Sequence, residues 1–237
     1  MILDIFKDAV EYSAQDWKSV VELGGFLFFS FLIFPIFLVW GYFYNVTQTA
    51  VNGLINGNDP LPKFNHLGDM LIKGIKIFLV KLLYGLLFLI LIYILYLSQL
   101  NFFITLTIVI IVGILLYLIS SIAMVHMVEK KGDMKSVFKI REILSIINSI
   151  GWSKLIGFYL GFMALAFGIF IVVTFLFGVV MGILGVTIQA MSLTLVIGNT
   201  MALLILLLYG IFISFIFIPY FVIFEGRALG LIYNLGK

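Results

Sequence analysis

The sequence contains no cysteine, only two histidines and four prolines, and little charge. Without cysteine, disulfides, thiol nucleophiles and thiolate metal sites are excluded. The two histidines, His66 and His126, are too few for a metal site built from histidine alone. Charged residues make up 11% of the chain and hydrophobic residues 64%, whereas soluble domains average about 25% and 45–50%. The net charge of +3 is too small to indicate a nucleic-acid partner.

Charged residues are absent from three long stretches of the chain. These stretches cover 23–58, 82–128 and 155–224 and are 36, 47 and 70 residues long. About 20 apolar residues cross the hydrocarbon layer as a helix, and one charge at its centre costs roughly 2.5–3.5 kcal/mol. We therefore predict an all-α, polytopic transmembrane helical bundle, a single integral membrane domain over 1–237. The predicted spans are 23–46, 71–97, 102–127, 155–186 and 195–224.

Two further segments have the pattern of amphipathic interfacial helices. In 1–21, apolar residues such as Ile5, Ala9 and Trp17 alternate with charged residues that include Asp8. The segment 129–152 begins as a basic loop and continues as apolar residues at helical spacing from Ile140 to Ile150. We expect this second helix to end near Gly151.

Prolines make two parts of this prediction depend on local backbone geometry. Pro35 lies near the middle of 23–46, where it would kink a span or break it into a re-entrant hairpin, which would raise the number of spans to six. The stretch 56–69, NGNDPLPKFNHLGD, contains strong turn signals. We predict a structural joint there, with a helix restarting at Leu67.

Small residues recur at steps of three and four in the first part of the longest uncharged stretch. The predicted helix-packing row is Gly157, Gly161, Ala164, Gly168, Gly178, Gly182 and Gly185. It favours one helix over two across 155–192, and such a helix would have to tilt or break near Gly178–Gly185 to fit a bilayer. The row would pack within the chain or between two copies. Near the turn that follows, Gln189, Asn199 and Thr200 would form a polar path for a solute or hydrogen bonds between helices.

The distribution of positive charge predicts an orientation. Twelve of the fourteen lysines and arginines fall at or after Lys63, on what would be one side of a five-span bundle. The positive-inside rule places the basic loops and the C-terminus in the cytoplasm, in a multi-pass protein of the cell membrane. With five spans the N-terminus would be outside, and with six it would be inside. In the basic loop, Lys130, Lys131, Lys135, Lys139 and Arg141 are candidates for contact with anionic lipid headgroups.

Three groups of ionisable residues are candidates for chemistry. Asp59, His66 and Asp69 would form a metal or acid–base site, or a proline turn followed by a helix start. His126, near the end of a span, would relay protons or be solvated at the interface. Glu225-Gly-Arg227 would form an ion pair at a pore mouth or bind an anionic headgroup, or would mark the cytoplasmic end of the last span.

The order of several short motifs resembles an uncharacterised archaeal family of integral membrane proteins, a domain of unknown function. The motifs are Gly41-Tyr42, Gly57-Asn-Asp-Pro-Leu-Pro-Lys-Phe64, Gly68-Asp69, Gly74, Tyr84, Pro219-Tyr220 and Glu225-Gly-Arg227. That family is distantly similar to the membrane portion beside bacterial glycerophosphodiester phosphodiesterases, but their catalytic domain has no counterpart in this chain. The resemblance implies a small helical bundle in an archaeal membrane and supplies no catalytic residues.

No catalytic motif occurs: there is no GxSxG, no phosphate-binding glycine loop and no HExxH. We therefore expect a non-catalytic membrane protein, without cofactor or metal, that organises or assists other membrane components. The alternatives are a transporter or channel for a lipid-like or apolar solute, and an enzyme that acts on lipid headgroups at the interface. Its expected partners are the bilayer, anionic headgroups, other membrane proteins and a second copy of itself.

Overall fold

A computed structural model describes the backbone of residues 1–190 and 195–237, and the side chains of 1–183 and 203–237. The elements in these ranges are helices. In chain order they are α1 (Ile2–Ser13), α2 (Trp17–Phe28), the 3-10 helix η1 (Phe29–Leu32), α3 (Phe34–Asn52), α4 (Leu67–Leu97), α5 (Phe102–Glu129), the 3-10 helix η2 (Met134–Phe138), α6 (Ile140–Ile150), α7 (Trp152–Ala190), α8 (Leu195–Phe212), the π-helix η3 (Ile213–Phe217) and α9 (Ile218–Asn234).

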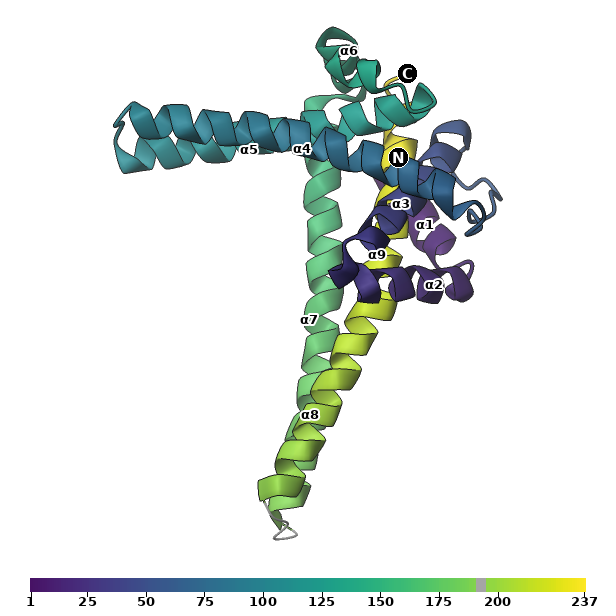
Figure 1. Cartoon of the computed structure of the whole chain (residues 1–237), viewed down its shortest axis with the longest axis vertical. Coiled ribbons are helices and arrows are strands. Elements are labelled where there is room, and N and C mark those ends of the chain that lie inside the picture. The colour runs from purple at the N-terminus through teal and green to yellow at the C-terminus, as the bar shows by residue number, and fades with distance from the viewer. Residues whose placement is uncertain (191–194) are drawn as a thin grey trace.

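Four long apolar segments dominate the molecule and form two hairpins. Within the described residues, Leu67–Leu97, Phe102–Glu129, Trp152–Ile183 and Leu203–Asn234 are long and apolar enough to cross a membrane. The first two are joined by a short turn over 98–101, and the last two form a long stem (Figure 1). Most of their apolar side chains are exposed, as expected for helices whose solvent is lipid. The chain is therefore a membrane-embedded helical protein.

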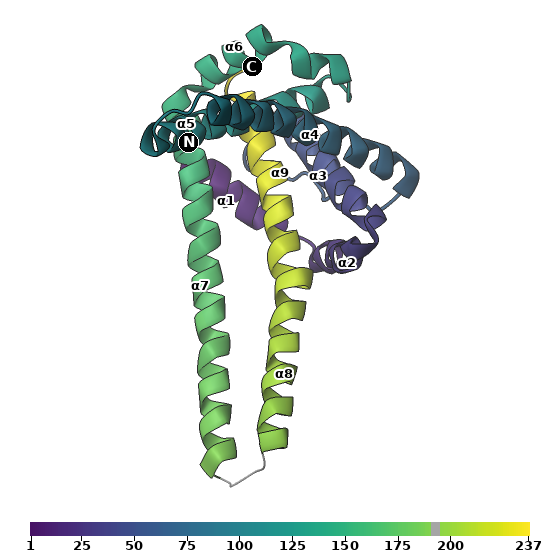
Figure 2. The same cartoon turned by 60° about the vertical axis from the view of Figure 1, so that its left-hand side comes forward.

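The two hairpins extend in different directions from a shared body. In Figure 1 the α4–α5 hairpin runs across the view and the α7–α8 stem runs down it, and Figure 2 shows the stem extending away from the other helices. Short helices α1, α2, α3 and α6 pack around the place where the hairpins meet. Because the hairpins diverge, a flat bilayer cannot enclose both along their full length in this arrangement.

The predicted span over 23–46 is wrong as a single helix. α2 ends at Phe28, η1 follows, and Ile33 takes a positive φ of 65° before α3 begins at Phe34. Pro35 lies in the first turn of α3 and does not kink the middle of a helix. A proline is well tolerated there because its missing N–H would have no partner inside the helix.

The predicted helix over 1–21 is likewise two helices. α1 ends at Ser13, and Asp16 caps α2 by accepting a hydrogen bond from the Lys18 N–H at 3.1 Å. The buried face of α1 consists of Ile5, Asp8, Ala9, Tyr12 and Ser13, and it packs against α9. Asp8, which the amphipathic pattern assigns to the polar face, is therefore inside the protein.

Glycine permits a close crossing of α3 and α4. A Cβ on Gly41 would overlap the backbone of Met70, and a Cβ on Gly74 would overlap the carbonyl oxygen of Phe37. The two glycines let the helix backbones touch, which gains dispersion contacts that larger residues would prevent. This crossing fixes the base of the α4–α5 hairpin.

Most glycines of the predicted row on α7 face open space. A Cβ at Gly157, Gly168, Gly178 or Gly182 would meet nothing within 4 Å, and one at Gly161 would meet only the ring of Phe6. Packing within the chain is therefore wrong for Gly157, Gly168 and Gly182, whereas Gly161 packs on Phe6 and Gly178 lines an apolar pocket between α7 and α8. A seam between two copies stays a prediction. The side chain position of Gly185 lies outside the described residues. α7 continues to Ala190 as one helix, so the favoured single helix is confirmed and the alternative of a break near Gly178–Gly185 is wrong.

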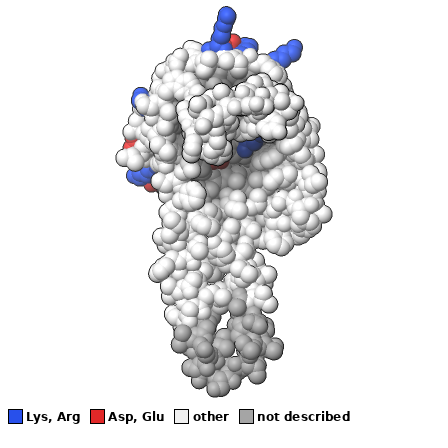
Figure 3. All heavy atoms as spheres, turned by 90° about the vertical axis from the view of Figure 1, so that its left-hand side faces the viewer, with Lys and Arg blue, Asp and Glu red and all other residues white. Residues whose placement is uncertain are grey.

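The segment after α5 forms a charged cap, which we define as residues 129–150. A helix is present there as α6, and Gly151 ends it with a positive φ of 93°. Its position at the membrane interface stays a prediction. Ile143, Ile147 and Ile150 are buried against the helices below, while the basic residues point outward. Figure 3 shows charged side chains gathered at this end and none along the described part of the stem on the face drawn.

The last helix continues past the two charged residues Glu225 and Arg227. The π-helix η3 lies just before Pro219, whose ring and missing N–H disturb the preceding turn. α9 then runs on to Asn234. The helix thus continues beyond Glu225-Gly-Arg227, and the placement of these residues at the cytoplasmic end of the last span stays a prediction.

Candidate functional site

Arg227 lies at the centre of a buried ion-pair cluster, the Arg227 hub, made of Asp8, Asp59 and Arg227. The guanidinium Nε donates to Asp8 Oδ1 at 2.7 Å and Nη2 to Asp8 Oδ2 at 3.2 Å, while Nη1 donates to Asp59 Oδ2 at 2.8 Å. The side chain of Arg227 is 0% exposed and that of Asp8 3%, whereas Asp59 is 31% exposed. Such bidentate geometry compensates for much of the cost of burying charge.

The hub joins three segments that are far apart in the sequence. Asp8 belongs to α1, Arg227 to α9 and Asp59 to the proline-containing turn, where Arg227 Nη2 also donates to the Leu54 carbonyl at 3.2 Å. The ring of Tyr12 lies 4.6 Å from the guanidinium carbon. Burial raises the pKa of Tyr12 to about 12, so its hydroxyl stays protonated and donates to the Pro60 carbonyl at 3.3 Å. The hub therefore supports the prediction that 56–69 is a structural joint.

A second polar cluster lies on the opposite side of α9, in what we call the Lys81–Glu225 crevice. The crevice has a volume of about 370 Å³ and lies between the α4–α5 hairpin and α9. Its polar lining consists of Lys81, Tyr84, Tyr117, Ser120, Ser121 and Glu225. Its apolar lining consists of Gly85, Phe88, Gly113, Leu116 and Met124. Pockets of a few hundred cubic ångströms with a few polar groups are typical small-molecule sites.

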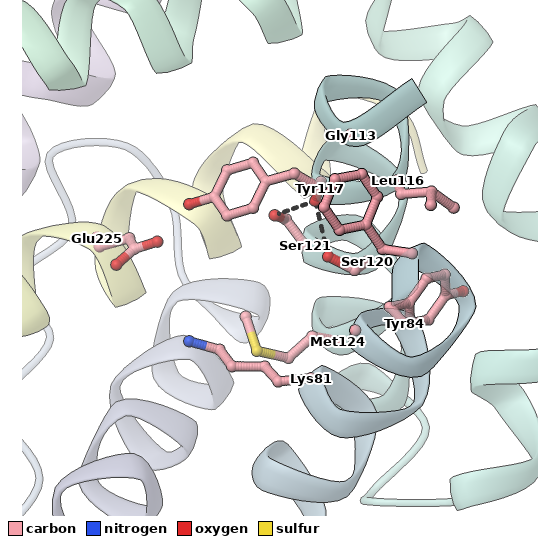
Figure 4. A pocket seen from close by; sticks show the side chains of 11 residues that line it. Lys81, Tyr84, Gly113, Leu116, Tyr117, Ser120, Ser121, Met124 and Glu225 are labelled. Carbon is pink, nitrogen blue, oxygen red and sulfur yellow. Dashed lines mark hydrogen bonds between the residues drawn. The ribbon is translucent and has the colours of Figure 1, made fainter. Parts of the chain in front are cut away.

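The charged groups gather at one end of the crevice. Figure 4 shows the ammonium of Lys81, the hydroxyl of Tyr117 and the carboxylate of Glu225 on the same side, with Leu116 and Tyr84 at the other. Ser120 and Ser121 both donate to the Tyr117 carbonyl at 2.8 Å, which leaves their oxygens able to accept. Figure 3 shows basic and acidic atoms in the hollow beneath the projecting hairpin.

Helical geometry explains why Glu225 and Arg227 serve different sites. Residues two apart on an α-helix point about 200° away from each other. Arg227 therefore faces α1, and Glu225 faces the α4–α5 hairpin. The prediction of an ion pair between Glu225 and Arg227 is wrong for this reason.

The residues predicted for a metal or acid–base site do not come together. Asp59 is in the hub, Asp69 pairs with Lys73 at 2.7 Å, and His66 is exposed just before α4. Asp69 lies in the first turn of α4, as the helix-start interpretation predicts. No three histidine, aspartate or glutamate side chains among those described gather where they could hold a metal ion. An enzyme acting on lipid headgroups would need several of Asp59, His66, Asp69, Glu225 and Arg227 to converge, and the structure joins the side chains of only Asp59 and Arg227.

His126 is buried, so the prediction of a solvated histidine is wrong. Its side chain is 4% exposed; Nδ1 lies 2.7 Å from the Tyr233 hydroxyl and Nε2 lies 3.3 Å from Glu142 Oε2. Because the end of α9 packs over the end of α5, the imidazole is enclosed by helices from three parts of the chain. Lys139 donates to Glu142 at 2.9 Å and thereby lowers the pKa of this exposed carboxyl.

The five basic residues predicted to contact lipid headgroups all lie in the cap, and Lys131, Lys135, Lys139 and Arg141 are exposed. Lys130 pairs with Glu129 at 3.0 Å and Lys139 with Glu142, which partly neutralises them. Contact with lipid stays a prediction. The polar-path residues Gln189, Asn199 and Thr200 have side chains outside the described residues.

Sequence reasoning missed Asp8, Lys81 and the roles of Tyr12 and Tyr117. A signal for Asp8 existed, because an arginine within the last span needs a buried acid as partner. A signal for Lys81 also existed: it is the last charged residue before a 47-residue uncharged stretch. Neither signal identifies the residue that lies opposite Arg227 or Lys81 in the folded protein.

The fold and the crevice define an integral membrane protein of helical hairpins with one amphipathic crevice at their base. The chain belongs to the family described as protein of unknown function (DUF4013), whose model matches residues 26–181. The match covers the α4 and α5 walls of the crevice but neither Asp8 nor α9. No curated protein and no solved structure matches the chain. The expected archaeal origin and the likeness to glycerophosphodiester phosphodiesterase membrane domains stay predictions.

Proposed function

We propose that this protein is a non-catalytic integral membrane protein that binds a membrane lipid in the Lys81–Glu225 crevice and thereby organises or assists other membrane components. The observation that carries the proposal is the amphipathic lining of the crevice, charged at one end and apolar at the other. A lipid has the same division between headgroup and chain.

The position of the crevice supports lipid over a water-soluble ligand. Lys81 is the last charged residue of α4 before its apolar half, so the polar end of the crevice lies toward the base of the α4–α5 hairpin. The apolar end continues onto exposed faces of the hairpin, such as Leu86, Leu89 and Ile114. An acyl or isoprenoid chain lying there would cover apolar surface at about 25 cal/mol per Å².

Filling the crevice tests the proposal. A Cβ at Gly85 would meet nothing within 4 Å, so Gly85→Leu fills the crevice without displacing the backbone. Gly168 on α7 is equally open but lies outside the crevice, and Gly168→Leu is the matched control. Native mass spectrometry of the purified full-length protein should show bound lipid in the wild type and in Gly168→Leu, with at least about a tenfold loss in Gly85→Leu. Equal lipid occupancy in all three proteins, or none in the wild type, would refute the proposal.

A further inference from the structure

The two charges of the crevice face the same space without pairing. Lys81 comes from α4 and Glu225 from α9, and both line the crevice. Within the described part of the chain, neither side chain makes an ion pair within 4.0 Å or a hydrogen bond, although polar side chains line the crevice beside both of them. Lys81 Nζ lies 5.8 Å from the centre of the Trp40 ring, a contact that leaves its donors available.

Opposite charges that face the same space attract each other, so their separation needs a structural cause. Glu225 is held in place by its helix, because Arg227, two residues on, is locked into the hub and Gly226 packs against Val46. The base of α4 is held in place by the Gly41–Gly74 crossing. The backbone positions of both charges are thus set by packing elsewhere, and the crevice remains between them.

A ligand that satisfies both charges must carry both signs itself. A headgroup phosphate would accept hydrogen bonds from Lys81, and a headgroup ammonium would donate to Glu225 and to the free acceptor positions of Ser120 and Ser121. A purely anionic headgroup would satisfy Lys81 but would place its charge near the Glu225 carboxylate. We infer that the crevice selects a zwitterionic phospholipid, with phosphate at Lys81 and ammonium at Glu225. This inference rests on the proposed function and adds the class of lipid.

The test measures lipid selection by the full-length protein. The protein is equilibrated with detergent micelles containing equal amounts of phosphatidylethanolamine and phosphatidylglycerol, and the retained lipids are counted by native mass spectrometry. Wild type should retain the zwitterionic lipid by about fivefold or more, the ratio expected from one additional partly buried ion pair. Glu225→Gln, which keeps the side-chain shape, should reduce this ratio to about one or reverse it.

Two further variants separate charge recognition from damage to the fold. The exchange of both charges, Lys81→Glu with Glu225→Lys, should restore the preference, because a zwitterion can bind in the reversed sense. Lys63→Gln, an exposed residue outside both the crevice and the cap, should leave the ratio unchanged. Inorganic phosphate added at millimolar concentration should not displace the lipid, since it lacks both the ammonium and the chain.

The outcomes also separate this inference from the proposed function. If wild type retains both lipids equally, lipid binding stands and selection by charge is refuted. If wild type retains neither, both ideas fail. If Glu225→Gln keeps the full preference for phosphatidylethanolamine while remaining folded, the assigned role of Glu225 is wrong.

Discussion

The Arg227 hub shows how one charged residue can be stable inside a chain that is mostly apolar. A single unpaired arginine would cost several kcal/mol in this environment. Here its donors are taken by two carboxylates and a backbone carbonyl, and an aromatic ring lies beside it. The local cost of burial is thereby largely offset, and the geometry fixes α1 and the 53–66 turn against α9.

Removing the arginine tests this account. Arg227→Met should lower the free energy of unfolding by about 3–5 kcal/mol, because Asp8 is then a buried charge without a partner. Adding Asp8→Asn to that variant should recover much of the loss. Thermal unfolding of the detergent-solubilised protein, followed by tryptophan fluorescence, would measure both effects.

Asp59, the more exposed carboxylate of the hub, should matter less for stability than Arg227. Because its side chain is 31% exposed, Asp59→Asn should cost about 1 kcal/mol or less. A variant Arg227→Met as stable as the wild type, or Asp59→Asn as damaging as Arg227→Met, would contradict the hub's proposed role.

At the scale of elements, helix packing depends on which glycines face another backbone. The glycine row on α7 has the spacing of a packing seam but mostly faces open space, whereas Gly41 and Gly74, which belong to no such row, let the backbones of α3 and α4 touch. The spacing of glycines along the sequence reveals a helix face without side chains. It does not reveal whether another helix covers that face.

The crossing yields a prediction with an internal control. Gly74→Ala should destabilise the protein by about 1–3 kcal/mol or more, since its Cβ would force α3 and α4 apart. Gly68→Ala, on the same helix with nothing within 4 Å, should be neutral or slightly stabilising because alanine favours helix. Unfolding in detergent is the measurement, and equal effects of the two substitutions would show that the crossing is not tight.

At the scale of the whole molecule, two apolar hairpins are joined to a charged cap. Lipid is the favourable solvent for the hairpins, and water is the favourable solvent for the cap. In the structure the hairpins diverge (Figure 1). If both cross the membrane, the angle between them has to narrow. Among the described helices, we expect bending at the π-helix η3 and movement of α7, which makes few contacts with the rest of the chain. Narrowing would also draw the hairpins together on the side of the crevice.

The absence of cysteine makes the topology directly testable. Single cysteines are introduced at Lys135 in the cap and at Gln99 in the turn between α4 and α5. If the α4–α5 hairpin spans the bilayer with the cap in the cytoplasm, a membrane-impermeant maleimide should label Gln99→Cys in intact cells and Lys135→Cys only after lysis. Labelling of both positions from the same side would show that this hairpin does not cross.

The cap yields a second prediction at this scale. Replacing Lys130, Lys131, Lys135, Lys139 and Arg141 with glutamine should weaken the preference of the reconstituted protein for vesicles containing anionic lipid. Each basic residue near such a surface contributes about 1 kcal/mol, and ion pairs with Glu129 and Glu142 reduce this for Lys130 and Lys139. Unchanged retention across vesicles of rising anionic content would remove the cap from consideration as a headgroup contact.

The sequence by itself determined the class of the protein, the positions of four long apolar helices, the joint at 56–69 and the helix that ends at Gly151. These features follow from local properties: runs of apolar residues, prolines in turns and a glycine at a helix end. The break at Ile33, the buried His126, the pairing of Asp8 with Arg227 and the meeting of Lys81 with Glu225 were decided only by the tertiary structure. Each depends on which surfaces of distant helices touch, and neither charge count nor periodicity along one helix carries that information.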